Sequence, residues 1–130
     1  QYMNNVLWQN DPDVIYVRDG SGSNPMTDDE VESLALWSGI LGGSVTTSDR
    51  PHRLTAARLA LLRFVQPGRQ RGMAELPLWH ARGRKTLVPV RSYPEHGAFG
   101  VLVVNPGEEP VTESFTVAEL VGARSATCFR

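Results

Sequence analysis

Length, composition and charge describe an ordinary globular chain. The 130 residues are 41% hydrophobic and 21% charged, which is typical of one folded domain or two half-units and not of a disordered or fibrous chain. Thirteen basic and fourteen acidic side chains give a formal net charge of -1, so there is no strong field to concentrate nucleic acid. No apolar run approaches the roughly 20 residues of a membrane-spanning helix. We therefore expect neither nucleic-acid nor membrane partners.

Metal and thiol chemistry have little support. The single cysteine, Cys128, cannot form an internal disulfide, and the redox compartment stays open. The histidines, His52, His80 and His96, are far apart and lack the spacing of metal ligands. We expect no cofactor.

The first half is predicted to alternate strands and helices. Residues 6–8 and 14–17 are apolar strands around a polar corner, and residues 19–25 form a loop. Thr27 lies three residues before Glu30, a capping box that predicts the start of a helix, and Gly42-Gly43 predicts its end. A short β-prone run follows at 44–47, and a second helix runs from about residue 54 or 55 to 65. This order predicts parallel strands joined by a helical crossover.

The second half is predicted to be β-rich. After a polar link at 69–72, the remaining sequence alternates like half-buried antiparallel strands at 86–93, 99–104 and 111–117. Turn-forming segments at 94–97 and 105–110 separate these strands. We therefore divide the chain into units 1–67 and 68–130.

Two polar clusters are candidate binding residues, because functional side chains collect where parallel strands end. The first cluster, Asn10, Asp11 and Asp13, follows the predicted strand at 6–8, which ends in Trp8. The second cluster, Ser48 and Asp49, follows residues 45–47. An ionised Asp accepts strong hydrogen bonds from sugar hydroxyls, and Trp8 offers an apolar ring face. The same residue types also build turns and cap backbone donors, so a purely structural role is the alternative.

Three segments resemble a known family. Leu7-Trp8-Gln9-Asn10-Asp11-Pro12-Asp13-Val14, then Thr27-Asp28-Asp29-Glu30 with Leu34-Ala35-Leu36-Trp37, then Thr47-Ser48-Asp49 resemble α-galactosidases (melibiases) of glycoside hydrolase families 27 and 36. The likeness covers about the first half of the chain in order and spacing.

The resemblance implies a fold and an activity. Residues 1–67 would be the last two β/α units of a TIM-type barrel, and 68–130 the opening strands of a C-terminal β-sandwich. The parent protein would be a retaining hydrolase of α-galactosides or related α-glycosides. Both catalytic Asp residues of the family lie on earlier barrel strands, and nothing in this chain aligns with them. Asp13 and Val14 would border the sugar pocket, and Asp11 would be a structural neighbour.

Two departures leave the subfamily and the sugar open: Gln9 stands between Trp8 and Asn10, and the Ser48-Asp49 segment lacks the usual Asn. Two barrel strands cannot close a barrel, so the remainder of the barrel is an expected partner and this piece alone should be inactive.

Two alternatives remain. The first is a non-catalytic carbohydrate-binding or interaction module, whose aromatic platform would draw on Trp79, Tyr93, Phe99, Phe115 and Phe129. The second is an unrelated α/β domain that shares the Asn-Asp-Pro-Asp turn by chance.

Overall fold

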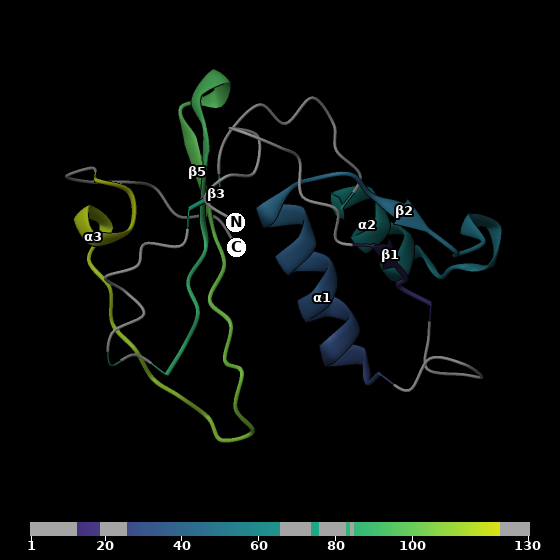
Figure 1. The fold of residues 1–130 in the computed structure, drawn as a ribbon, viewed down its shortest axis with the longest axis horizontal. Helices are drawn as coiled ribbons and strands as arrows, with labels where there is room; N and C mark the ends of the chain where they lie inside the picture. Colours follow the sequence, from purple (N-terminus) through teal and green to yellow (C-terminus); the bar gives the residue numbers. More distant parts are fainter. Residues whose placement is uncertain (1–12, 19–25, 66–73, 76–82, 84, 123–130) are drawn as a thin grey trace.

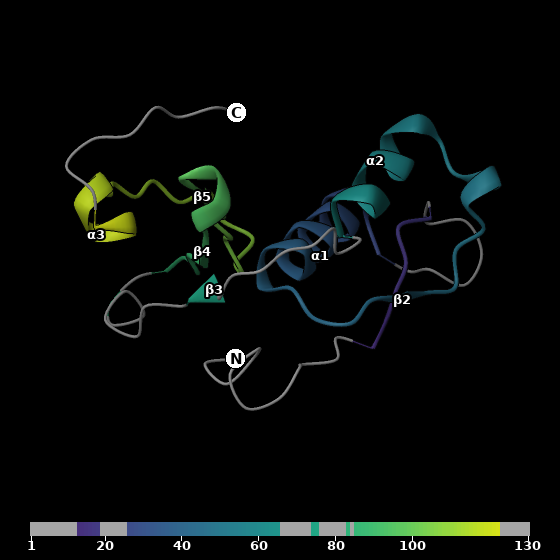
Figure 2. The ribbon, with the colours of Figure 1, turned by 90° about the horizontal axis from the view of Figure 1, so that it is seen from above.

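The computed structural model describes residues 13–18, 26–65, 74–75, 83 and 85–122. These residues form a two-stranded parallel sheet, a three-stranded antiparallel sheet and three α-helices. Figures 1 and 2 both place helix α1 between the antiparallel sheet and helix α2. In the described part of the chain the strands close no barrel, and no helix there is long and apolar enough to cross a membrane.

Helix α1 spans Asp28–Leu41 and begins as the capping box predicts. The Thr27 hydroxyl accepts the Glu30 backbone N–H at 3.3 Å, and the Glu30 carboxylate accepts the Thr27 backbone N–H at 2.7 Å. Gly42 ends the helix with φ 68° and ψ 178°, a backbone region that is essentially restricted to glycine. Both predicted ends of this helix are therefore confirmed.

Strands β1 (Val14–Ile15) and β2 (Thr46–Thr47) lie on either side of α1 in the sequence and pair in parallel. The parallel pairing expected across the helical crossover is confirmed for these two strands. An apolar cluster under the pair joins it to the helices, and its buried members are Ile15, Val17, Val31, Ala35, Leu62 and Val65.

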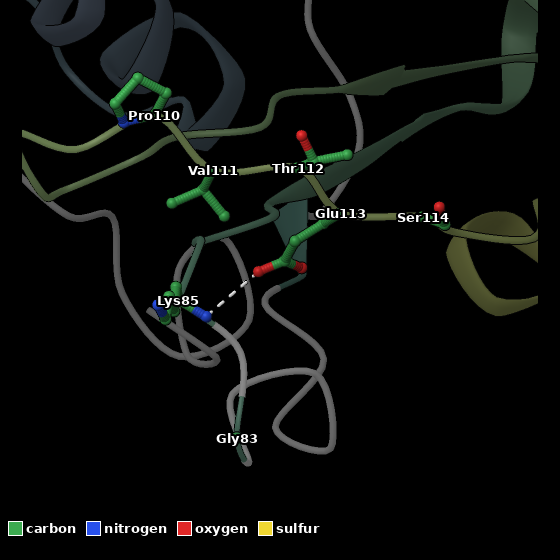
Figure 3. A pocket seen from close by; sticks show the side chains of 7 residues that line it. All are labelled: Gly83, Lys85, Pro110, Val111, Thr112, Glu113 and Ser114. Carbon is green, nitrogen blue, oxygen red and sulfur yellow. Dashed lines mark hydrogen bonds between the residues drawn. The ribbon is translucent and has the colours of Figure 1, made fainter.

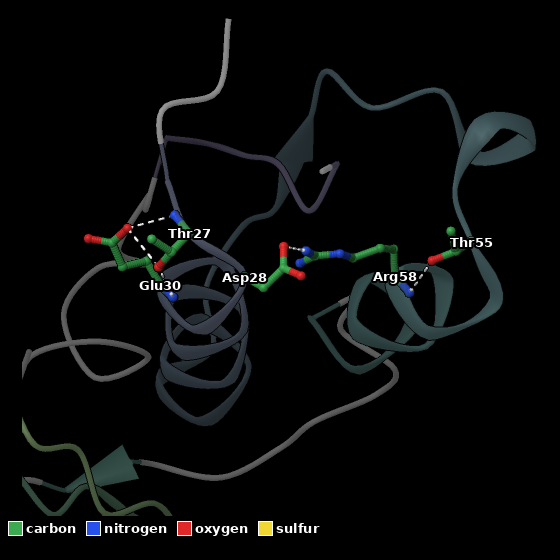
Figure 4. A network of polar contacts seen from close by, with 5 residues as sticks. All are labelled: Thr27, Asp28, Glu30, Thr55 and Arg58. Atoms are coloured by element: carbon green, nitrogen blue, oxygen red, sulfur yellow. Dashed lines mark hydrogen bonds and ion pairs between the residues drawn. The ribbon is translucent and has the colours of Figure 1, made fainter. Parts of the chain in front are cut away.

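Helix α2 (Ala56–Val65) follows a short 3-10 turn at Pro51–Arg53 and agrees with the second predicted helix. The Thr55 hydroxyl accepts the Arg58 backbone N–H at 3.3 Å, and the Arg58 guanidinium pairs with the carboxylate of Asp28 in the first turn of α1. Figure 4 shows these contacts beside the capping box. The two helices also approach closely at Gly39, where an added Cβ would lie 2.3 Å from Phe64 Cε1.

The antiparallel sheet has the order β3-β4-β5, from Ala74–Glu75, Val90–Tyr93 and Ala98–Val101. The predicted antiparallel pairing of the second half is confirmed for β4 and β5, which continue to an isolated bridge between Leu87 and Val104. The ladder is interrupted at Pro89, which has no N–H to donate. Strand β3 was not predicted. It has only two residues, Ala74 and Glu75, directly after the polar link, and these are too few to show an alternating pattern.

One predicted strand is wrong. Residues 111–116 carry no strand in the structure, and Val117–Val121 form the short helix α3. A second capping box explains the difference: the Thr116 hydroxyl accepts the Glu119 N–H at 3.1 Å, and the Glu119 carboxylate accepts the Thr116 N–H at 2.7 Å. Gly122 then ends the helix in a left-handed conformation. Local capping therefore overrides the β pattern at the end of this segment.

Arg91 joins the two halves of the chain. Its side chain, on β4, is buried with 1% of the residue exposed. Its Nη1 donates to the carbonyls of Ile40 at 3.1 Å and Gly39 at 3.4 Å, where α1 ends and carbonyls lack helical partners. Burial lowers the pKa of Arg91 from the ordinary arginine value. The predicted boundary at 67/68 lies outside the described residues, but the units on either side of it are in contact.

Candidate functional site

Asp13 and Val14 lie at the amino end of β1. Asp13 is exposed and has φ 65°, a left-handed backbone that is uncommon outside glycine, although Asp tolerates it better than most residues. The Asp13 carbonyl accepts the Thr46 hydroxyl of β2 at 3.2 Å. Val14 pairs with Thr46 and is 45% exposed. A carboxylate, an apolar side chain and a hydroxyl therefore lie together on the surface.

Ser48 and Asp49 lie at the other end of the same strand pair. Because β1 and β2 are parallel, with Val14 opposite Thr46, the residues after β2 are level with those that follow β1. Asp13 instead precedes β1. The described candidates thus do not form one cluster, since Asp13 and Val14 occupy one end and Ser48 and Asp49 the other.

Asp49 holds the carboxyl ends of the two strands together. Its side chain is completely buried. One carboxylate oxygen accepts the Val17 backbone N–H at 2.6 Å, and the other pairs with Arg18 Nη1 at 3.2 Å. The Asp49 backbone N–H donates to the Thr47 hydroxyl at 3.1 Å. These bonds match the structural alternative for this residue, in which the carboxylate caps backbone donors.

Arg18 is a charged group that pairs with Asp49 and reaches solvent. Its side chain is 33% exposed, its Nη1 donates to the Ser48 hydroxyl at 2.9 Å, and its guanidinium lies 4.6 Å from the centre of the Tyr16 ring. Such stacking favours a fixed guanidinium position. Sequence reasoning missed Tyr16 and Arg18. Their position at the end of a predicted strand was the available signal.

A shallow pocket of about 400 Å³ lies in the second half of the chain, and its lining residues, 83, 85 and 110–114, include none of the predicted site residues. Figure 3 shows that Glu113 points from one wall toward Lys85 on the other. The Glu113 carboxylate accepts the backbone N–H groups of Lys85 at 3.1 Å and Thr86 at 3.2 Å. Its acidic group therefore holds two chain segments together, which is a structural role.

The remaining candidates of the polar motif, Trp8, Asn10 and Asp11, lie outside the described residues. So do two of the five aromatic residues considered for a sugar platform, Trp79 and Phe129. Of the other three, Phe99 is exposed and Tyr93 and Phe115 are partly buried. The described part of the chain therefore presents one exposed aromatic ring from this set, too few for a platform.

Across the described ranges, no three His, Cys, Asp or Glu side chains gather as ligands for a metal ion. The described candidates are hydroxyls, carboxylates and a guanidinium in two separate groups, one at each end of the strand pair, and such groups can hydrogen-bond neutral polar ligands. Comparison with family models, curated proteins and solved structures finds no match to this chain.

Proposed function

We propose that this chain is the C-terminal part of a retaining glycoside hydrolase of the α-galactosidase type, acting on α-galactosides or related α-glycosides. It would contribute to the sugar pocket without supplying the two reacting carboxyl groups. The support is the ordered resemblance of three segments in the first half, together with a parallel strand pair joined through helix α1. A helical crossover between parallel strands is the repeating unit of a β/α barrel.

The observation that carries the proposal is the conformation of Asp13. A non-glycine residue with φ 65° costs roughly 1 kcal/mol or more, and such strain concentrates at functional sites. Its exposed carboxylate can accept hydrogen bonds from sugar hydroxyls. Exposed Val14 beside it, with Trp8 as a further candidate, would contact the apolar side of the sugar ring.

The roles of the residues follow from their surroundings. In a retaining enzyme the two reacting carboxyls stand about 5 to 5.5 Å apart, and in this proposal both come from the remainder of the barrel. Asp49 is unsuited to acid–base chemistry, because both of its oxygens are bonded within the fold and the side chain is buried. Asp13 would orient one sugar hydroxyl at the amino end of β1, and Asp49 would fix the carboxyl ends of the two strands at the other end of the pair.

The test uses the intact protein that carries this chain and a chromogenic α-galactoside. Asp13→Asn keeps a side chain that tolerates the left-handed backbone but removes the charge. Losing a charge-assisted hydrogen bond costs about 1.5 to 3 kcal/mol, so kcat/KM should fall roughly tenfold to a hundredfold. The unfolding midpoint should stay unchanged.

Asp13→Gly is the second variant, because glycine adopts this backbone without steric cost. A loss of kcat/KM in both variants would then come from the carboxylate and not from strain. Ser48→Ala is the matched control at the other end of the strand pair and should retain activity. No turnover of any α-glycoside by the intact protein would refute the proposal, as would Asp13 variants with wild-type kcat/KM.

A further inference from the structure

Strand β5 is the last strand of the antiparallel sheet among the described residues. Where the chain continues beyond β5, alternate residues bond to the segment just before β4: Leu102 N–H donates to the Pro89 carbonyl at 3.1 Å, and Val104 N–H to the Leu87 carbonyl at 2.8 Å. In an antiparallel pair the residues between these direct their N–H and C=O groups the other way. Phe99, Val101 and Val103 therefore direct their backbone groups away from β4.

The same three residues have exposed apolar side chains, with Phe99 46%, Val101 40% and Val103 51% exposed. We call these residues the β5 edge. Residues 98–104 contain no charged side chain and no proline, the devices that usually prevent a sheet edge from pairing. The paired residues Arg91 and Gly100 face α1, which fixes the hairpin, and among the described residues no strand pairs with its outer edge.

Acidic residues flank the β5 edge at both ends. Glu95 lies in the 3-10 turn before β5, and Glu108 and Glu109 follow the hairpin strand, all of them exposed. A second copy paired antiparallel about Val101 would bring Glu95 of one copy close to Glu108 of the other, and like charges across a strand pair are unfavourable. A segment with basic ends would instead meet carboxylates at both ends.

We infer that the β5 edge binds an extended apolar segment of a partner protein that carries Lys or Arg at each end. The segment adds to the sheet as a strand: its backbone bonds to Phe99, Val101 and Val103, and its basic ends pair with Glu95 and Glu108. Main-chain bonds supply affinity in this mode of recognition, and the side chains supply selectivity. This inference does not depend on the proposed hydrolase activity.

The first test measures binding of two labelled synthetic peptides to the whole chain by fluorescence anisotropy. Both have a centre of alternating Val and Thr, one with Lys at both ends and the other with Glu. The Lys peptide should bind more tightly by roughly fivefold, as expected for two exposed ion pairs, and salt should reduce the difference. In the double variant Glu95→Lys with Glu108→Lys, the preference should reverse.

The second test removes one outward backbone donor. Val101→Pro deletes the N–H directed away from β4 while the inward bonds of the neighbouring residues remain, and it should weaken Lys-peptide binding roughly tenfold. Val101→Thr keeps the N–H and is the matched control. Val103→Pro repeats the test at the next outward position, with circular dichroism confirming that each variant is folded.

Three results would overturn the inference. They are failure of both peptides to bind, equal affinity for the two peptides, and binding that neither proline variant weakens. Analytical ultracentrifugation at the same concentrations tests whether a second copy of this chain occupies the β5 edge. A dimer that dissociates in Val101→Pro would mean that the β5 edge pairs with its own copy instead.

Discussion

The buried carboxylate of Asp49 is a structural element of the strand pair. One oxygen accepts the Val17 backbone N–H, just after β1, and the other pairs with the Arg18 side chain. A single residue that follows β2 therefore fixes the chain that leaves β1. A buried backbone donor that loses its acceptor is costly. The residue therefore maintains the parallel register at the end where a β/α array places its loops.

Replacing Asp49 tests this role. Asp49→Ala should lower the free energy of unfolding by about 1 to 3 kcal/mol, because the Val17 N–H stays buried without an acceptor. Asp49→Asn keeps one acceptor and should cost less. Ser48→Ala is the control, since it removes one exposed contact and should change stability by less than about 0.5 kcal/mol. Urea denaturation measures all three. An Asp49→Ala variant as stable as Ser48→Ala would contradict the assignment.

The residue types of the polar clusters were predictable, but their arrangement was not. Asp49 and Asp13 both follow from the sequence as polar residues beside strands. Which of them is buried depends on how β1 pairs with β2, with Val14 opposite Thr46. No local sequence pattern determines this register. Arg18 was missed because its significance lies in a partner that is 31 positions away in the sequence.

At the scale of elements, the capping box is the signal that worked best. Thr27 and Glu30 predicted the start of α1 correctly. The same spacing at Thr116 and Glu119 was overlooked in favour of the alternating pattern before it, and α3 begins there. The alternation itself is real, since burial alternates along residues 111–116. However, Glu113 bonds to the backbone of Lys85 and Thr86 through its side chain, and no strand is formed there.

The α1 capping box makes a pH-dependent contribution to stability. Hydrogen bonds from the Thr27 backbone N–H and then the Thr27 hydroxyl lower the pKa of Glu30. Because the folded pKa is below the unfolded one, the stabilisation is complete above the unfolded pKa. It is lost as the pH falls through the lowered, folded pKa. Glu30→Gln should therefore be less stable than wild type at neutral pH, and the difference should shrink in acid.

Guanidinium denaturation at a series of pH values between neutral and acid measures this difference. Guanidinium salt screens distant charges equally in both proteins, so the comparison isolates the local bonds. Glu32→Gln is the matched control, with the same charge change on an exposed side chain of α1 outside the capping box. A gap between wild type and Glu30→Gln that stays constant with pH, or that Glu32→Gln reproduces, would exclude the capping box as its source.

At the scale of the whole molecule, the contact between the two halves was not predictable. Sequence patterns treat an arginine in a strand as a solvent-facing residue, yet Arg91 is buried against the last carbonyls of α1. Two glycines allow this approach. A Cβ added at Gly42 would lie 2.5 Å from Arg91 Nη1, and one at Gly100 would lie 2.9 Å from Ile40 Cδ1. The junction arises from long-range packing of small residues, which no local signal reveals.

Gly42 allows this junction to be measured beside a second glycine that ends a helix. Gly42 and Gly122 both end helices, with φ 68° and 69°, but a Cβ at Gly122 meets nothing within 4 Å. Gly122→Ala should cost about 1 to 2 kcal/mol from the left-handed backbone alone. Gly42→Ala should cost more for two reasons: its ψ of 178° lies in a region essentially restricted to glycine, and the new methyl group also displaces the Arg91 guanidinium from the carbonyls of α1.

A double-mutant cycle separates the two contributions to the Gly42→Ala cost. If the collision with Arg91 matters, Gly42→Ala should be less destabilising in an Arg91→Ala background, with a coupling energy of about 0.5 to 3 kcal/mol. Backbone strain is the same in both backgrounds and cancels. Thermal denaturation gives the stabilities, and hydrogen exchange of the β4 and β5 amides should show lost protection in Gly42→Ala while α2 keeps its own. An additive cycle would mean that the halves are joined without the contact between Arg91 and the end of α1, and the packing of Gly100 on Ile40 would then be the remaining link.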